Sequence, residues 1–294
     1  MIRHEIPLPR GRRLVIDDRP LVMGIINVTP DSFYPGSRRR SCVEALDTAR
    51  AMSAAGAALI DVGGESTRPG SESVSLDEEL ERVVPVIEAV RGESDLPISV
   101  DTRKAAVAAA ALDAGADIVN DIGGLRHDLE MAPLVSARGV PVVIMHMLGE
   151  PRTMQVAPLY GDCPAEVRDF LLEAAARAQG AGIARGNIIL DPGIGFGKRL
   201  EDNLAILHRL EELVATGFPV LVGLSRKAFV GAITGKHVEG RLAGSLGAAC
   251  AAYLKGARIF RVHDVAETVD ALAVLRSSLA GAAPEPAESV ERAR

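Results

Sequence analysis

The chain of 294 residues contains no tryptophan and few other aromatic residues, with six Phe and three Tyr. This scarcity argues against a β-sandwich whose core is rich in aromatic side chains. Hydrophobic residues still make up 48% of the sequence. Ala, Val, Leu and Ile can therefore fill a sizeable core, as they do in layered α/β folds.

Paired cysteines, a basic excess and long apolar runs are also missing. Cys42, Cys163 and Cys250 are far apart, so no disulfide framework or zinc-ligand spacing is present, which favours a reducing, cytoplasmic location. The 33 basic residues are outnumbered by 39 acidic ones, and nucleic acid is therefore not expected as a partner, because binding it requires a basic face. No window approaches about 18 unbroken apolar residues and no signal peptide is visible, so we expect no membrane segment.

Short apolar runs alternate along the chain with longer segments of helical periodicity. The runs are nearly continuous rather than alternating, which is typical of parallel strands buried on both faces. The expected strands are Leu21–Ile26, Ala58–Val62, Pro97–Val100, Asp117–Asn120, Val140–Met145, Asn187–Leu190, Pro219–Gly223 and Arg258–Val262. The helical patterns between them include Ser41–Ala55, Leu76–Val90, Arg103–Ala114, Pro164–Gly180, Asn203–Val214 and Arg241–Lys255.

Eight such units without a linker predict a closed (β/α)₈ TIM barrel, in preference to an open doubly wound sheet. Ile2–Ile16 has a Pro-Arg-Gly turn between two apolar runs and predicts an N-terminal β-hairpin that caps the bottom of the barrel. Residues 1–280 are expected to form one catalytic domain. Residues 281–294 are polar with two prolines and predict a disordered tail.

Polar residues follow every expected strand, at the end where TIM barrels carry their active sites. In chain order they are Asn27, Asp61, Asp101, Asn120 with Asp121, His146, Asp191, Ser225, and Arg261 with His263. Any single Asp, Asn or Ser could instead cap the helix that follows it. Helix capping does not explain His146, or Arg261 and His263 two residues apart, so the set predicts a converging polar site.

Three loop motifs make this interpretation specific. They read Asn-Val-Thr-Pro-Asp-Ser-Phe over 27–33, Glu-Ser-Thr-Arg-Pro-Gly over 65–70 and Asp-Pro-Gly-Ile-Gly-Phe-Gly-Lys over 191–198. With the strand ends around them, they resemble the dihydropteroate synthase family from about Val22 to Val269. The resemblance implies that 6-hydroxymethyl-7,8-dihydropterin diphosphate is joined to 4-aminobenzoate in folate synthesis, with release of pyrophosphate.

The resemblance also implies roles for individual residues. Catalytic roles fall on Asp101, Lys227, Arg261 and His263. Asp101, Asn120, Asp191 and Lys227 match pterin-binding positions, with Asp61 beside them. Carboxylate and amide groups suit the row of ring nitrogens and the exocyclic amine of a pterin. Arg261, His263, Thr67 and Arg68 match the diphosphate site, and arginine suits phosphate because its planar fork forms paired hydrogen bonds.

The remaining positions concern the metal and the amine. Asn27 matches a Mg²⁺ position, where one protein oxygen suffices because Mg²⁺ keeps waters and binds phosphate. The 4-aminobenzoate positions are Phe33, Thr67, Pro69, Gly195, Phe196, Ser225 and Lys227. The family also implies a homodimer, to which the late helices contribute.

The sequence departs from the family pattern in two loops. Tyr34–Ser37 replaces the more usual Ser-Asp-Gly-Gly, and Leu148–Glu150 replaces Gln-Gly-Thr. Two other functions are compatible with the pterin-binding residues. A methyltetrahydrofolate:corrinoid methyltransferase would share the pterin-binding residues but needs no diphosphate site, and a non-catalytic paralogue would bind pterin without turnover.

Overall fold

The computed structural model describes residues 3–28, 38–66, 71, 73–282 and 290–292. Its main sheet has eight parallel strands in the order β8-β7-β6-β5-β4-β3-β10-β9. These strands are β3 (Leu21–Asn27), β4 (Leu59–Gly63), β5 (Ile98–Asp101), β6 (Ile118–Asp121), β7 (Val142–Met145), β8 (Ile188–Asp191), β9 (Leu221–Gly223) and β10 (Ile259–Val262). A bridge between Leu190 and Val220 joins the first strand of this order to the last and closes the barrel. The predicted TIM barrel is confirmed.

Each expected strand is present, and most begin one or two residues later than the apolar run. Several extend to the polar residue that follows the run, as at Asn27, Asp101, Asp121 and Asp191. The register aligns Asp101 with Asn120 on the neighbouring strand. The strand ends therefore bring the polar residues to one rim.

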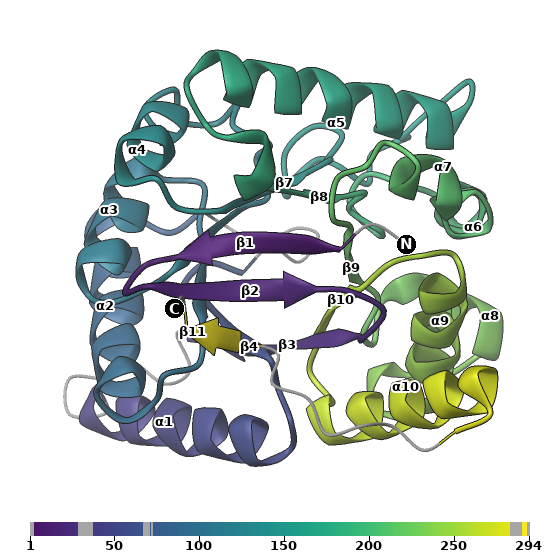
Figure 1. Ribbon diagram of the computed structural model, residues 1–294. Helices are drawn as coiled ribbons and strands as arrows, with labels where there is room; N and C mark the ends of the chain where they lie inside the picture. The colour runs from purple at the N-terminus through teal and green to yellow at the C-terminus, as the bar shows by residue number, and fades with distance from the viewer. Residues whose placement is uncertain (1–2, 29–37, 67–70, 72, 283–289, 293–294) are drawn as a thin grey trace.

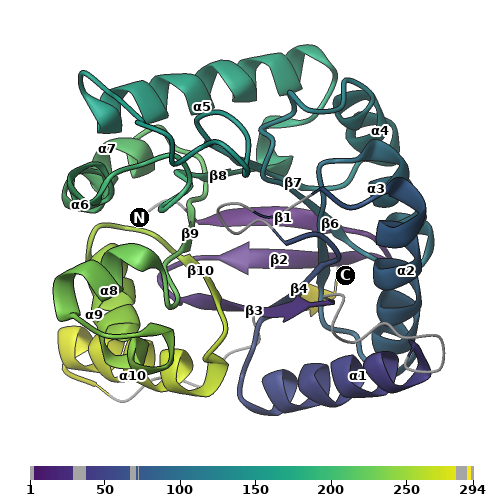
Figure 2. The same ribbon diagram turned by 180° about the vertical axis from the view of Figure 1, so that it is seen from behind.

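Helices surround the barrel in both views along its axis (Figures 1 and 2). They are α1 (Arg38–Ala54), α2 (Leu76–Glu93), α3 (Ala105–Asp113), α4 (Met131–Arg138), α5 (Cys163–Gly180), α6 (Leu200–His208), α7 (Leu210–Val214), α8 (Ala228–Thr234), α9 (Leu242–Leu254) and α10 (Val265–Ala280), with 3₁₀ turns η2 (Arg185–Asn187) and η3 (Val238–Gly240). The single helix expected over Asn203–Val214 is wrong. The chain leaves helical geometry at Arg209, with φ −109° and ψ 23°. The Arg209 guanidinium holds this break by donating to Asp162 and Glu212.

The predicted N-terminal hairpin is confirmed. Strands β1 (His4–Leu8) and β2 (Arg12–Ile16) pair antiparallel and cross the opening of the ring of helices that faces the viewer in Figure 1. Ile6 and Leu14 are fully buried against residues from the amino ends of the barrel strands, such as Leu59 and Ile118. The hairpin thus seals the end of the barrel opposite the polar rim.

A third short strand, β11 (Val290–Arg292), pairs with β2. It lies within the segment 281–294, for which the sequence predicts a disordered tail. The division into a domain of residues 1–280 and a tail stays a prediction.

One buried carboxylate anchors the hairpin to the barrel. Asp117, just before β6, is fully buried and accepts hydrogen bonds from the guanidinium groups of Arg10, Arg12 and Arg91. The donor–acceptor distances are 2.5 Å for Arg10 and 2.6 Å for Arg91, and the Ile98 amide adds another bond of 2.9 Å. Since Arg10 and Arg12 belong to the hairpin and Arg91 to α2, this one side chain ties three elements together.

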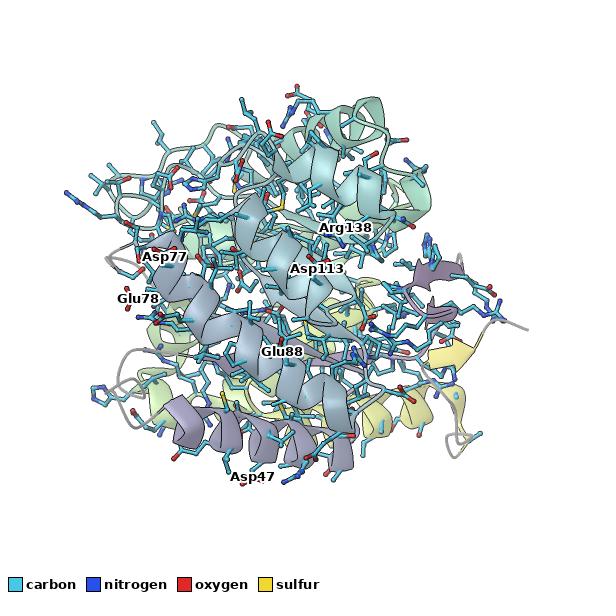
Figure 3. All side chains as sticks on the ribbon, turned by 90° about the vertical axis from the view of Figure 1, so that its left-hand side faces the viewer. Asp47, Asp77, Glu78, Glu88, Asp113 and Arg138 are labelled. Carbon is cyan, nitrogen blue, oxygen red and sulfur yellow. The ribbon has the colours of Figure 1, made fainter. Side chains whose placement is uncertain are left out.

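The outer faces of the helices carry charged side chains (Figure 3). Asp113 on α3 and Arg138 on α4 form an exposed ion pair of 2.6 Å between neighbouring helices. No helix in the described part of the chain combines the length and the apolar composition that crossing a membrane requires.

Candidate active site

Five polar side chains from different strands meet inside the carboxyl end of the barrel. Asp61 lies in β4, Asp101 ends β5, Asn120 lies in β6, Asp191 ends β8, and Arg261 projects from β10. Asp61 is fully buried, and Asp101, Asn120 and Asp191 are nearly so. The sequence predicted all five as site residues, and the structure brings them together.

Arg261 bridges two of these carboxylates. Its Nε donates to Asp61 Oδ2 at 2.6 Å, and its Nη2 donates to Asp101 Oδ2 at 2.7 Å. The Asn120 amide donates to the same Asp61 oxygen, with Nδ2 3.2 Å from Oδ2. The deepest part of the site is therefore a connected set of hydrogen bonds in which one cation faces two anions.

Burial sets the protonation behaviour of this network. Burial raises the pKa of Asp101 to about 7 even though Arg261 opposes the shift. Burial likewise raises the pKa of Asp191, against the attraction of Lys227. Burial alone would lower the pKa of Arg261, but Asp61 and Asp101 raise it well above its usual range, so the guanidinium stays charged. Pockets in which burial and charged partners shift several pKa values are typical of functional sites.

Two loops complete the wall between the deep network and solvent. Loop six (Pro192–Arg199) follows β8, and loop seven (Leu224–Lys227) follows β9. The Lys227 ammonium lies 4.4 Å from the centre of the Phe196 ring and donates to the Ile194 carbonyl. Burial lowers the pKa of Lys227 to about 8, against the attraction of Asp191. Loop seven therefore holds its cation against loop six.

Ser225 and His263 lie together at the rim. The His263 Nδ1 is 3.1 Å from Ser225 Oγ, which also accepts from the His263 backbone amide at 3.2 Å. Between Ser225 and Lys227, the backbone of Arg226 adopts a left-handed conformation with φ 55°. Its guanidinium is held by both carboxylate oxygens of Asp264 at 2.6 and 2.8 Å. This turn presents Ser225 and Lys227 on the same side of the loop.

The other predicted positions fall outside this cluster or outside the described residues. Asn27 is exposed at the end of β3. Gly195 lies in loop six, where its amide donates to Asn203 Oδ1 at 2.6 Å. Phe33, Thr67, Arg68 and Pro69 lie outside the residues that the structure describes.

His146 does not join the converging polar site that its place at a strand end predicted. It is buried beside Lys198, with 2.9 Å between His146 Nδ1 and Lys198 Nζ. Its ring packs edge-on against Phe170, with 4.8 Å between ring centres. An apolar neighbour on a helix far along the sequence directs this side chain, which a local pattern could not reveal.

A further polar network, around Glu65 just after β4, was not predicted from the sequence. Glu65 accepts from Arg103 at 2.6 Å and from Lys104 at 2.6 Å. Arg103 donates in addition to Glu150 at 2.7 Å, one of the residues by which this chain departs from the family pattern. The signal in the sequence is limited to Glu65 in the 65–70 motif and the adjacent basic residues Arg103 and Lys104 after a later strand.

Known proteins are similar to this chain in sequence and fold. The sequence profile of the family described as "Pterin binding enzyme" matches residues 23–263. The chain belongs to the pterin-binding enzyme family. Dihydropteroate synthase of Escherichia coli (strain K12) is 48% identical over 262 residues, which are 88% of this chain and 92% of that protein.

Solved structures of this family agree with the fold as well. A Xanthomonas albilineans dihydropteroate synthase with 4-aminobenzoic acid superposes with a TM-score of 0.88 at 45% identity and covers 95% of this chain and 99% of its own. A Burkholderia cenocepacia dihydropteroate synthase complexed with 7,8-dihydropteroate gives 0.85 at 45% identity, with 96% and 99% covered. The family resemblance seen in the sequence is confirmed, whereas the roles of individual residues stay predictions.

Proposed function

We propose that this chain is a dihydropteroate synthase, which joins 6-hydroxymethyl-7,8-dihydropterin diphosphate to 4-aminobenzoate and releases pyrophosphate. The observation that carries the proposal is the hydrogen-bonded set of Asp61, Asp101, Asn120 and Arg261 beside Asp191, inside the carboxyl end of the barrel. Relatives of nearly full length with this name support it.

The buried acceptors suit the pterin ring. Asp101 and Asp191 can accept from its amine and ring N–H groups, and the Asn120 amide can both donate and accept. Leaving one such buried group without a partner costs about 1–3 kcal/mol, which discriminates against other rings. Lys227 lies beside this set and donates to the pterin carbonyl side. Its present hydrogen bond to Ile194 shows that the ammonium reaches into the wall of the site.

The reaction breaks the bond between the pterin methylene carbon and the diphosphate oxygen. The nitrogen of 4-aminobenzoate then bonds to that carbon and loses a proton, while pyrophosphate leaves with the electron pair. The Arg261 guanidinium and the His263 imidazole at the rim stabilise negative charge on the departing pyrophosphate, since positioned hydrogen-bond donors and cations act where charge develops. Asp101 stabilises positive charge on the pterin. Ser225 receives the carboxylate of 4-aminobenzoate at the rim, and Phe196 packs on its ring.

Asn27 is the residue that would hold Mg²⁺. The described residues contain no group of three or more His, Cys, Asp or Glu side chains that could bind a metal ion. A single amide oxygen on an exposed strand end fits a Mg²⁺ ion that keeps its waters and takes phosphate oxygens from the substrate. Bound there, the ion neutralises charge on the diphosphate.

The first prediction tests this activity. With the dihydropterin diphosphate, 4-aminobenzoate and Mg²⁺, the protein is expected to release pyrophosphate and form 7,8-dihydropteroate, which is separated by chromatography and quantified directly, and excess EDTA is expected to stop the reaction. Pterin binding without release, from folded protein, would instead identify a paralogue that has lost catalysis. Full activity in EDTA would refute the assignment of Mg²⁺.

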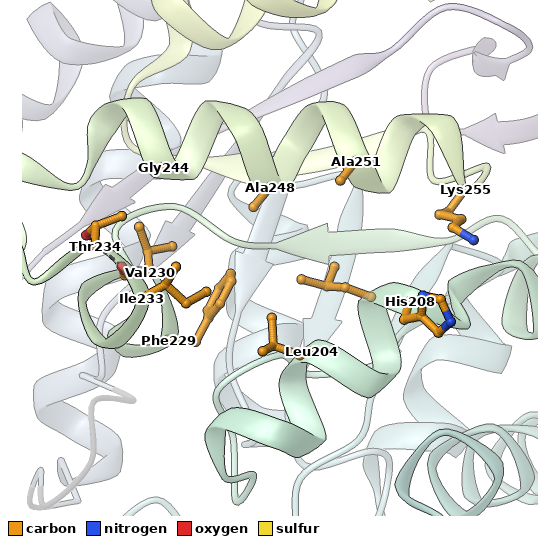
Figure 4. Close-up of a pocket in the computed structure, with 11 residues that line it drawn as sticks. Leu204, His208, Phe229, Val230, Ile233, Thr234, Gly244, Ala248, Ala251 and Lys255 are labelled. Atoms are coloured by element: carbon orange, nitrogen blue, oxygen red, sulfur yellow. Dashed lines mark hydrogen bonds between the residues drawn. The ribbon is translucent and has the colours of Figure 1, made fainter.

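The proposed partner besides the substrates is a second copy of the chain. A groove of about 380 Å³ lies between α6, α8 and α9 (Figure 4). Mostly apolar side chains line it, and Leu204 and Ile233 among them are 41% and 57% exposed. Apolar surface gathered in one place is typical of a protein–protein contact.

We expect Ile233→Asp to convert a dimer into a monomer, because burying an unpaired carboxylate opposes association. Size-exclusion chromatography with light scattering measures the mass. Leu129→Asp is the matched control: Leu129 is 80% exposed and lies outside the groove. A wild-type monomer, or a dimer that survives Ile233→Asp, would contradict the proposed contact.

A cytoplasmic location belongs to the same proposal and is supported by the three unpaired cysteines.

A further inference from the structure

Loop six has no helix or strand of its own, and side chains hold its backbone. Each of the six successive carbonyls from 193 to 198 accepts a hydrogen bond from a side chain. The donors are Lys198 Nζ to Gly193 (2.9 Å) and Phe196 (3.0 Å), Lys227 to Ile194, Gln155 to Gly195 (2.7 Å), Tyr160 to Gly197 (2.7 Å) and Asn203 to Lys198 (3.3 Å). Lys198 is the only one of these donors that binds two of the carbonyls.

Each N–H of the Lys198 ammonium has one acceptor nearby. Lys198 is 3% exposed, and its three short contacts are the two loop-six carbonyls and His146 Nδ1. Burial, together with the charges of Lys198 and Arg126, lowers the pKa of His146 to about 2. The imidazole is therefore neutral, so its Nδ1 can accept a hydrogen bond. Three acceptors thus match the three protons of an ammonium group.

This arrangement is a poor device for stability alone. Among the described residues no carboxylate lies within salt-bridge distance of Lys198 Nζ, and all its hydrogen bonds go to uncharged acceptors. Burial lowers the pKa of Lys198 to about 7, against the attraction of Asp191 and Asp202, so holding a charge at this position is costly. An apolar side chain of similar volume is often at least as stabilising. We therefore infer that Lys198 contributes mainly by fixing the conformation of loop six.

The backbone of loop six also packs closely against the backbone of residues 146–148, which follow β7. At Gly193, with φ 63°, a Cβ would lie 2.0 Å from the His146 carbonyl oxygen. At Gly197, with φ 60°, it would lie 2.7 Å from the Leu148 carbonyl oxygen. Lys198 clamps the loop between these two close approaches, and so fixes where Phe196 stands.

We propose that Lys198, held by His146, is a positioning residue that keeps loop six in the conformation in which Gly195 and Phe196 form the wall of the 4-aminobenzoate pocket. This inference rests on the proposed function. Lys198 holds the carbonyl of Phe196 while Lys227 lies over its ring, so the main chain and the side chain of one residue are fixed from opposite sides. The pterin-binding carboxylates lie on strands, and Asp191 also accepts a hydrogen bond from the Gly193 amide at 2.7 Å.

The test is Lys198→Met, which keeps the length of the side chain and removes its donors. We expect the KM for 4-aminobenzoate to rise about tenfold or more, and the KM for the pterin diphosphate and kcat to change less than about threefold. Lys236→Met is the control, because Lys236 is exposed after α8 and outside the site. Equal rises in both KM values, or a fall in kcat alone, would overturn the proposal.

A second measurement separates this inference from the proposed function. Hydrogen–deuterium exchange of the amides from 193 to 198 needs no turnover, and Lys198→Met is expected to speed it at least tenfold relative to wild type and to Lys236→Met. If wild type releases no pyrophosphate, the proposed function fails while the exchange still decides whether Lys198 holds the loop. Unchanged exchange refutes the clamp.

Lys198→Met could prevent folding, which circular dichroism would show. Gln155→Ala and Tyr160→Phe then decide, because they remove single donors to the same loop from less buried positions. Each is expected to raise the KM for 4-aminobenzoate about threefold and to leave the KM for the pterin diphosphate unchanged. If neither raises the KM for the amine, the proposal is wrong.

Discussion

Replacing Arg261 with alanine is expected to lower kcat for pyrophosphate release by about 100- to 1,000-fold, the usual loss when a fixed charge-stabilising donor is removed. Binding of the free pterin alcohol, which lacks the diphosphate, is expected to weaken less than about tenfold, since only interactions stronger in the transition state affect kcat. In the proposed assignment, the free pterin is bound by Asp101, Asn120 and Asp191, which this substitution leaves in place. Steady-state kinetics and a fluorescence titration with the free pterin measure the two effects.

Loss of Arg261 also leaves Asp61 and Asp101 without the cation that joins them. Two carboxylates that share a buried site cannot easily both ionise, so the variant is expected to take up a proton there. Arg138→Ala, which removes a surface ion pair on α4, is the control and should change kcat less than about twofold. Retained kcat together with lost affinity for the free pterin would contradict the role assigned to Arg261.

Asp117→Asn is expected to reduce the free energy of unfolding by about 3–5 kcal/mol, because it removes the buried anion that three guanidinium groups share. Urea unfolding followed by circular dichroism measures the change. Both KM values should stay close to wild type, since Asp117 lies at the amino end of β6 and the site lies at the carboxyl end.

Asp113→Asn provides the comparison for this stability effect. Asp113 pairs with Arg138 on the surface, where an ion pair contributes at most about 1 kcal/mol. A loss below about 1 kcal/mol in Asp117→Asn as well would mean that the hairpin is held by its apolar face alone. In that case Ile6 and Leu14, not the charge cluster, anchor β1 and β2.

The sequence predicts the barrel because every strand is a short apolar run followed by a polar residue. The carboxyl ends of parallel strands meet at one edge of the sheet, so the sequence alone places Asp101 beside Asn120, and the register of β5 and β6 pairs them. That reasoning says which residues share a rim. It does not say which of them bind one another, and the bridge from Arg261 to Asp61 and Asp101 was not foreseen.

Contacts between distant segments explain the rest. Asp117 is the first residue of a predicted strand, and its partners Arg10 and Arg12 lie more than 100 residues earlier in the chain. His146 follows a strand as the active-site residues do, yet Phe170 and Lys198 enclose it. Local periodicity carries no information on such pairings. The interruption of the expected helix at Arg209 likewise depends on Asp162 in another segment.

The closure of the barrel at Leu190 and Val220 has a consequence for ligand binding. The other neighbouring strands in the described barrel share registers of three residue pairs or more, whereas β8 and β9 are joined by this one bridge. Loop six follows β8 and loop seven follows β9. The contacts of Lys227 with Ile194 and Phe196 therefore connect the two strands that share the fewest backbone pairs in the barrel. A ligand that binds these side chains only when β8 and β9 are joined also stabilises the junction between the two strands. Its binding free energy opposes their separation.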